Sequence, residues 1–197
     1  MQQFLASSKY IDWQHPAVLA KAQALAAGSA ANSRELIRRC FEFVRDDIKH
    51  CMDYQLDTLT CKASDVLVHG TGFCYAKSHL LAALLRANGV PTGLCYQRLT
   101  FTVGKPPYTL HGLNAVYLDD IGWFRIDARG NKRGVDAQFT PPIERLAFAI
   151  EVAGEEDLPG VLAEPLPAIV DVLTRYGSVK DAVKNLPDVE PTTWQAG

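Results

Sequence analysis

A single cysteine of this chain lies where a glycine-rich turn meets an apolar segment. Cys74 follows Gly70 and Gly72, and residues 74–88 are apolar around nearly the whole circumference of a helix, which indicates a helix buried on most sides. At the start of such a helix, unpaired N–H groups and the positive end of the helix dipole favour a thiolate over a thiol. We therefore expect Cys74 to be a nucleophile whose own N–H binds an oxyanion. The alternative is a small apolar residue that begins a core helix.

A thiolate that attacks acyl groups needs a base within hydrogen-bond reach and a third group that orients this base. His111 begins one strand-like segment and Asp127 ends the next, with a turn candidate at residues 119–122 between them. If the hairpin is centred near Asp120, the pairing keeps both odd-numbered side chains on one face of the sheet. A hairpin centred between two residues places them on opposite faces. The predicted set of Cys74, His111 and Asp127 therefore depends on the register.

The other histidines are weaker candidates for the base. His79 follows Cys74 on the same predicted helix and points about 140° away around the axis, which is typical of a core or rim histidine. His69, in the turn near Cys74, is the better rival, but no carboxylate at a matching spacing orients it. We interpret His15 and His50 as surface or loop residues.

Further polar residues leave alternatives open. A zinc site from His50, Cys51 and Cys61 is disfavoured because the chain has no C-x-x-C pair. Gln55 and Gln97 are both candidates for a second oxyanion donor, and their spacing does not choose between them. After the carboxylate comes a basic group that is suited either to a substrate carboxylate or to a solvated loop: Arg129, Lys132 and Arg133.

The elements that must position these residues follow from periodicity and from turn signals. We predict helices at residues 15–27, 34–48, 64–68 and 74–88, and a final helix at 166–176. Strand-like segments are 94–103, 111–118, 122–128 and 146–150, with a break at 105–107 and a polar turn at 69–72. Residues from Pro187 onward are expected to be poorly ordered.

Length and composition exclude several classes of protein. The chain has 197 residues, of which 48% are hydrophobic and 21% charged, as in one globular domain. A net charge of -2 gives no general attraction to nucleic acid or to an anionic membrane. No secretory signal or membrane-spanning segment is apparent, and five cysteines suit a reducing compartment. We expect a cytoplasmic protein without nucleic-acid or membrane partners, of unknown oligomeric state.

Several blocks of this sequence resemble the bacterial transglutaminase-like superfamily. They occur in the expected order and together cover about residues 45–130: ASDVL at 63–67, GFC at 72–74, LLAALLRANGVP at 80–91, HGLNAVYL at 111–118 and WFRID at 123–127. The resemblance implies a papain-like α+β fold, in which a buried cysteine-bearing helix packs on an antiparallel sheet, with N-terminal helices and a C-terminal helical extension. It assigns Cys74 as nucleophile, His111 as general base and acid, and Asp127 as the orienting carboxylate.

The expected domain is single and spans residues 1–197, with a catalytic core at about 33–150 and an extension at about 151–197. No cofactor or metal is implied. The family often has His-Ala-Trp and Asp-Pro-Thr where this chain has HGL at 111–113 and DAR at 127–129. These departures favour hydrolysis of an amide or peptide bond in a peptide, protein or small amide over general protein crosslinking.

Three alternatives to hydrolysis remain. A transglutaminase or deamidase would act on glutamine side chains with the same three residues. A binding module would retain the scaffold without turnover, since a fold does not dictate function. An arylamine N-acetyltransferase-like enzyme would transfer a small acyl group, but the sequence has no recognisable coenzyme-binding feature.

Overall fold

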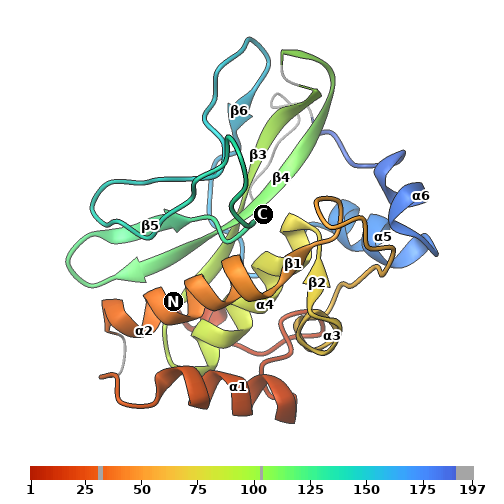
Figure 1. The fold of residues 1–197 in the computed structure, drawn as a ribbon. Coiled ribbons are helices and arrows are strands. Elements are labelled where there is room, and N and C mark those ends of the chain that lie inside the picture. The colour runs from red at the N-terminus through yellow and green to blue at the C-terminus, as the bar shows by residue number, and fades with distance from the viewer. Residues whose placement is uncertain (31–32, 103, 190–197) are drawn as a thin grey trace.

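The computed structural model of the protein describes residues 1–30, 33–102 and 104–189. Several helices gather beside α4 (Cys74–Ala87), and a curled antiparallel sheet stands against them (Figure 1). The helical elements that precede α4 are η1 (Gln2–Phe4, 3₁₀), α1 (Pro16–Ala26), α2 (Arg34–Glu42), η2 (Phe43–Asp47, π) and α3 (Ala63–His69). Two short helices follow the sheet, α5 (Pro167–Arg175) and α6 (Val179–Val183).

Helix α4 forms the centre of the core, as its all-round apolar sequence predicts. Every residue from Cys74 to Arg86 is buried. The helix ends at the predicted stop, where Asn88 is the C-cap and Gly89 has a φ of +77°, a conformation that glycine adopts without strain. The buried Arg86 is satisfied by donating hydrogen bonds to three backbone carbonyl groups, those of Ala6, Thr92 and Ala163.

The main sheet has the strand order β5-β4-β3-β6, and all its neighbouring strands are antiparallel. Its members are β3 (Thr92–Thr102), β4 (Lys105–Leu118), β5 (Gly122–Ile126) and β6 (Glu156–Asp157). Leu118 pairs with Gly122, so the β4–β5 hairpin is centred on Asp120. One face of the sheet lies on α4, where the Asn114 side chain donates to the Ser78 carbonyl at 2.9 Å.

Two of our expectations for the sheet are wrong. The expected break at residues 105–107 is part of a strand, because β4 begins at Lys105 instead of His111 and runs through both prolines. Strand β5 pairs only with residues 114–118, so the proline end of β4 lies at a sheet edge, where a missing N–H costs little. Residues 146–150 form no strand, and the N–H of Ala147 binds the Asp127 carboxylate instead of a neighbouring strand.

The expected polar turn at residues 69–72 contains a further element. Gly70 caps α3 in the left-handed conformation, and β2 (Thr71–Gly72) then pairs in parallel with β1 (Lys49–His50). Strand β1 lies in a stretch of sequence without a clear period. This two-stranded pair is short, but it leads directly into the cysteine that begins α4.

The segment after β5 returns to the same core. Leu162 exchanges backbone hydrogen bonds with Leu94 of β3, and Ile169 of α5 belongs to the main hydrophobic cluster. Two later residues also bind the sheet. The N–H of Leu110 donates to the carbonyl of Pro187, and the Arg98 side chain donates to the carboxylate of Asp188. The rest of the tail that we expected to be poorly ordered, residues 190–197, lies outside the described part. Within the described ranges no helix combines the length and apolar character needed to cross a bilayer.

Candidate active site

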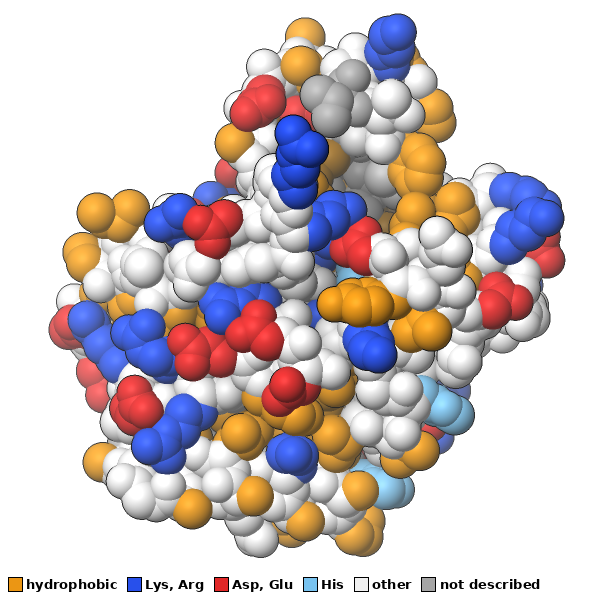
Figure 2. All heavy atoms as spheres, viewed as in Figure 1, with side chains coloured by type: hydrophobic (Ala, Val, Ile, Leu, Met, Phe, Trp, Pro, Cys, Tyr) orange, Lys and Arg blue, Asp and Glu red, His pale blue; other side chains and the backbone are white. Residues whose placement is uncertain are grey.

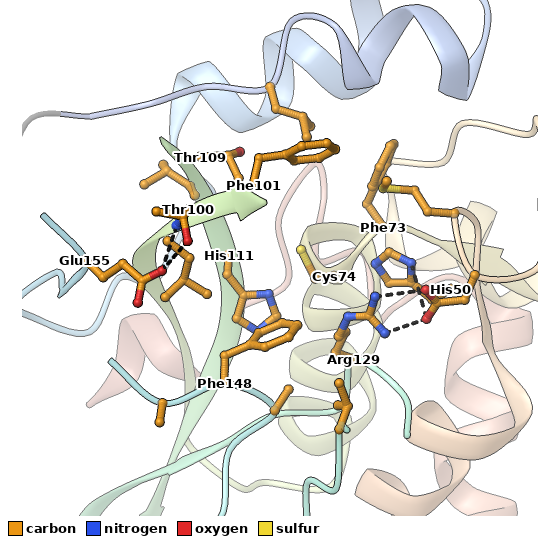
Figure 3. A pocket seen from close by; sticks show the side chains of 18 of the residues that line it. His50, Phe73, Cys74, Thr100, Phe101, Thr109, His111, Arg129, Phe148 and Glu155 are labelled. Atoms are coloured by element: carbon orange, nitrogen blue, oxygen red, sulfur yellow. Dashed lines mark hydrogen bonds and ion pairs between the residues drawn. The ribbon is translucent and has the colours of Figure 1, made fainter. Parts of the chain in front are cut away.

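Cys74 is the first residue of α4, and its side chain lies in the wall of a cavity of about 660 Å³ (Figure 3). The preceding residue, Phe73, is the N-cap and has no side-chain acceptor for the first-turn N–H groups. These N–H groups have no carbonyl one turn earlier in the helix to bind. The start of α4 therefore offers hydrogen-bond donors beside the sulfur, as the sequence predicted.

His111 of β4 and Asp127, one residue beyond β5, are hydrogen-bonded to each other. The hairpin centre at Asp120 places the two side chains on one face, and His111 Nε2 lies 2.8 Å from Asp127 Oδ2. Because Asp127 occupies Nε2, Nδ1 is the ring nitrogen left for Cys74. Figure 3 shows the His111 ring beside Cys74 at the same cavity. The structure thus brings the three predicted residues together.

Asp127 is buried, and both of its carboxylate oxygens accept hydrogen bonds. Besides His111, it accepts N–H bonds from Arg129 and Ala147, each at 3.0 Å. Burial alone would raise the pKa of this carboxyl, but the charge and hydrogen bond of His111 and the two N–H donors hold it below the usual value. Asp127 is therefore an ionised, immobile partner that fixes the orientation of the imidazole.

The surroundings of His111 favour its protonated form. Burial opposes this charge, but Asp127, the charge of Cys74 and hydrogen bonds to both raise the pKa of His111 to about 10. The Phe148 ring meets the imidazole edge-on, with ring centroids 5.0 Å apart. Phe148 belongs to the irregular segment that we predicted as a strand, so this contact was not foreseen.

His50 is the main correction to the sequence analysis. We expected a surface or loop residue, but its side chain is only 5% exposed and lines the cavity that contains Cys74. Its ring meets Phe73 edge-on, at 6.1 Å between centroids, and its Nδ1 lies 4.0 Å from Asp53 Oδ2. Pairing of β1 with β2 places His50 opposite Gly72, so the histidine is carried to the cysteine by the two-stranded sheet.

Three charged side chains near His50, those of Asp53, Arg129 and Lys132, form part of the cavity wall. Arg129 binds Asp53 through both terminal nitrogens, with Nη2 at 3.0 Å from Oδ1, and Lys132 binds the same carboxylate at 2.7 Å. Arg129 is buried, whereas Arg133 is exposed and does not line the cavity. Of the basic residues after Asp127, Arg129 and Lys132 thus line the cavity, whereas Arg133 is solvent-exposed.

Lys77, one turn after Cys74 on α4, is a buried cation that the sequence analysis did not single out. Its ammonium group donates to the carbonyl of Ile48 and, at 3.3 Å, to that of Arg45. Burial and the positive charge of Arg129 lower its pKa to about 7. The lysine ties the cysteine helix to the chain immediately before His50.

The remaining candidates lie away from the cavity. Gln55 is exposed, and the amide nitrogen of the buried Gln97 donates to Asp157 at 2.9 Å. His69 is exposed at the end of α3, while His79 is fully buried, with Nδ1 at 2.7 Å from the carbonyl oxygen of Cys61. The described residues contain no group of three or more His, Cys, Asp or Glu side chains that could hold a metal ion.

Comparison with known proteins agrees with this architecture. The family model of the transglutaminase-like superfamily matches residues 20–128, more than half of the chain, and the chain belongs to that superfamily. The matched region contains α4, the hairpin that carries His111, and Asp127. The fold predicted from the sequence, a papain-like arrangement of a cysteine-bearing helix on an antiparallel sheet, is confirmed.

Solved structures with related folds are distant in sequence. A Cytophaga hutchinsonii protein reported as a "putative cysteine protease" is 20% identical, with a TM-score of 0.51 over 64% of this chain. The periplasmic domain of TgpA from Pseudomonas aeruginosa is also 20% identical, with a TM-score of 0.46 over 64% of this chain. This chain spans only 40% and 46% of those two chains, respectively. No curated protein matches the sequence significantly.

Proposed function

We propose that this protein is a thiol-dependent acyl-transfer enzyme that hydrolyses an amide or peptide bond. The observation that carries the proposal is the hydrogen-bonded His111–Asp127 pair, which faces Cys74 in a cavity. Each member has the environment its role requires: a sulfur at a helix start, an imidazole held by one nitrogen, and a carboxylate whose ionised form is stabilised.

The reaction would proceed in two steps. The Cys74 thiolate attacks the acyl carbon, a carbon–sulfur bond forms, and the carbonyl electron pair moves to oxygen. The tetrahedral intermediate then collapses, and His111 transfers its proton to the departing amine as the carbon–nitrogen bond breaks. In the second step, neutral His111 takes a proton from water, which attacks the thioester and releases the acid and the thiolate. No cofactor or metal takes part in these steps.

The cavity supports a substrate of peptide-like size. Its volume of about 660 Å³ is in the range of ordinary ligand sites, and its wall combines apolar side chains with the charged group around Asp53. Positive and negative side chains are mixed over the face seen in Figure 2, which does not favour a nucleic-acid partner. The five cysteines are free, as expected for the reducing cytoplasm that we propose as its location.

The proposal is tested with pooled fluorogenic peptide amides and with casein plus a fluorescent primary amine. Hydrolysis predicts release of the fluorophore by the wild type and its loss in Cys74→Ala and His111→Ala. Incorporation of the amine into casein without peptide cleavage would instead identify the transglutaminase alternative. If the Cys74→Ala variant retained the activity of the wild type, the assignment of the nucleophile would be wrong.

A further inference from the structure

Attack on a carbonyl creates an oxyanion, and one donor beside Cys74 is already evident. This is the backbone N–H of Cys74 itself, in the first turn of α4. A side chain that lines the cavity is a candidate for a second donor. Neither glutamine considered from the sequence lines the cavity, since Gln55 is exposed elsewhere and Gln97 is bound to Asp157. The position is thus open for another residue.

His50 stands at this position. In Figure 3, the His50 ring lies across from His111 with Cys74 between them. An acyl group bound to the sulfur would therefore have the proton donor for its leaving group on one side and His50 on the other. This is the arrangement that separates the leaving group from the carbonyl oxygen.

The ring nitrogens of His50 differ in their surroundings. Nδ1 is buried and has no hydrogen-bond partner in the described part of the chain. The carboxylate oxygen of Asp53 at 4.0 Å is too distant for a hydrogen bond, and Asp53 already accepts from Arg129 and Lys132. Nδ1 lacks a hydrogen-bond partner in either tautomer, whereas an acceptor at Nε2, such as an oxyanion, selects the tautomer that carries its proton on Nε2. The Nε2 atom is not sealed within the core and has no protein partner among the described residues.

Burial and nearby positive charges keep this ring neutral. Burial and the positive charges of Arg129, Lys77 and His111 hold the pKa of His50 well below its usual value, with Asp53 opposing them only in part. Neutral His50 presents one N–H donor at physiological pH and does not compete with His111 as the acid. Two histidines near one cysteine are thereby driven to opposite protonation states, as expected for two different roles.

The backbone around His50 is held in place from two sides. His50 pairs with Gly72, and the N–H of Cys51 donates to the Gly72 carbonyl at 3.1 Å. On the other side, the Lys77 ammonium group binds the carbonyl of Ile48. The first contact joins β1 to β2, which leads into α4, and the second joins the residue before β1 to α4, so the backbone on both sides of His50 is anchored near Cys74. A preorganised donor needs this kind of support.

We propose that Nε2–H of His50 and the backbone N–H of Cys74 together bind the oxyanion that forms when the Cys74 thiolate attacks an acyl group. This inference rests on the proposed acyl-transfer function. In the step concerned, the carbonyl electron pair moves to oxygen and both N–H groups donate to that oxygen. No proton leaves His50, and collapse of the intermediate restores the carbonyl.

Two small reagents separate this role from simple activation of the thiol. p-Nitrophenyl acetate acylates Cys74 through a tetrahedral oxyanion, with p-nitrophenolate as the leaving group, whereas iodoacetamide alkylates the thiolate by direct displacement without an oxyanion. Both rates are measured on the full chain by intact mass, and the site is confirmed with Cys74→Ser. The informative quantity is the acylation rate divided by the alkylation rate.

Three variants test whether the ratio of acylation to alkylation depends on an N–H donor at position 50. His50→Leu, which removes the N–H donor, should lower the ratio at least about tenfold, given that the loss of one such donor costs about 10²–10³ in turnover of a natural substrate. His50→Gln, which keeps an N–H donor in the same place, should recover much of the ratio. His69→Leu replaces an exposed histidine outside the cavity and should match the wild type.

The outcomes distinguish this inference from the function on which it rests. An unchanged ratio in His50→Leu, an equal loss of acylation and alkylation, or a failure of the folded His50→Gln protein to recover the ratio would each overturn the role of His50. If neither reagent modified Cys74 of the wild type faster than a free thiol, the proposed function itself would fail. Circular dichroism of each variant checks folding. If His50→Leu does not fold, His50→Gln is compared with His50→Asn. The shorter Asn side chain must then give the lower ratio of acylation to alkylation.

Discussion

At the scale of single residues, the site is defined by how its surroundings distribute charge. Burial lowers the pKa of both histidines, but Asp127 and Cys74 more than offset it at His111, whereas three nearby cations lower the pKa of His50 further. Their difference comes from Asp127, which binds His111 directly, and from Asp53, which is occupied by Arg129 and Lys132.

The raised pKa of His111 predicts the alkaline limit of activity. The imidazolium should persist through neutral pH and be lost as the pH rises through about 10, so the acylation rate of Cys74 should fall there. The charge on His111 likewise stabilises the fold fully below its unfolded pKa of about 6.5, and this contribution is lost as the pH rises through about 10. Hydrolysis of a fluorogenic peptide amide across pH measures the limit, because its amine leaving group needs the proton of His111.

Asp127→Asn should move that limit to lower pH and reduce the rate by a factor on the order of 10³, because the amide cannot stabilise the imidazolium. Asp136→Asn, at an exposed carboxylate that pairs with Arg145, is the matched control and should leave the profile unchanged. A profile in Asp127→Asn that coincided with that of the wild type would show that His111 does not depend on this carboxylate.

The cysteines should differ in reactivity at neutral pH. Burial raises the pKa of both Cys40 and Cys95 to about 12, and neither lines the cavity. We therefore expect iodoacetamide to label Cys74 first, as read by peptide mapping after short exposure. Faster labelling of Cys40 or Cys95 in the native protein would contradict the view that Cys74 is the activated thiol.

At the scale of elements, helix α4 and strand β4 are in direct backbone contact at Gly112. A Cβ added there would lie 2.9 Å from Tyr75 Cδ1, 3.1 Å from its Cα and 3.3 Å from its N. The last two atoms belong to the backbone of α4 and cannot move without moving Cys74. The glycine that follows His111 therefore sets the distance between the cysteine helix and the histidine strand.

Gly112→Ala should accordingly separate Cys74 from His111. We expect a loss of stability of about 1–3 kcal/mol, typical of overpacking, together with a larger relative loss of acylation rate. Gly177→Ala is the control, since a Cβ at Gly177 meets nothing within 4 Å and its φ is not positive. Urea denaturation and p-nitrophenyl acetate acylation measure the two effects. Full acylation activity in Gly112→Ala would refute this account of the contact.

Lys77 makes the junction between α4 and β1 sensitive to pH. Burial lowers the pKa of Lys77 from its usual 10.5 to about 7, so the unfolded chain binds more protons between these values. The stability of the wild type relative to Lys77→Met should therefore rise as the pH increases from 7 to 10.5. Urea denaturation across this range tests the slope, with the exposed Lys62→Met as control. An equal pH dependence of the wild type and Lys77→Met would contradict the lowered pKa.

The elements that sequence patterns predict best are those with strong local signals. The all-round apolar run and the Asn88-Gly89 stop define α4. The sequence left the hairpin register open, and the observed centre at Asp120 is the alternative that places His111 and Asp127 on one face. The role of His50 could not be predicted from the sequence, because β1 is only two residues long and the burial of His50 depends on pairing with β2, which lies about 20 residues later in the chain. Residues 146–150 carry a β-like composition, but Asp127 takes the N–H of Ala147, and no ladder forms.

At the scale of the whole molecule, the segment after residue 150 completes the core that holds the site. Leu158 donates to the Tyr96 carbonyl, Leu166 to the Tyr96 hydroxyl, and the side chains of α5 join the main cluster. We therefore predict one cooperative unfolding transition for the intact chain. Near-ultraviolet and far-ultraviolet circular dichroism should give coincident curves, whereas two separated transitions would contradict the single domain.

The central claim is that Cys74 forms a covalent acyl intermediate with the help of His111 and Asp127. The most direct measurement is intact-mass analysis after reaction with an electrophilic peptide-like probe at neutral pH. The account predicts one adduct per chain in the wild type, located on Cys74, with none in Cys74→Ser and a much slower reaction in His111→Ala. A wild-type protein that stayed unmodified, or an adduct that formed equally fast in His111→Ala, would contradict it.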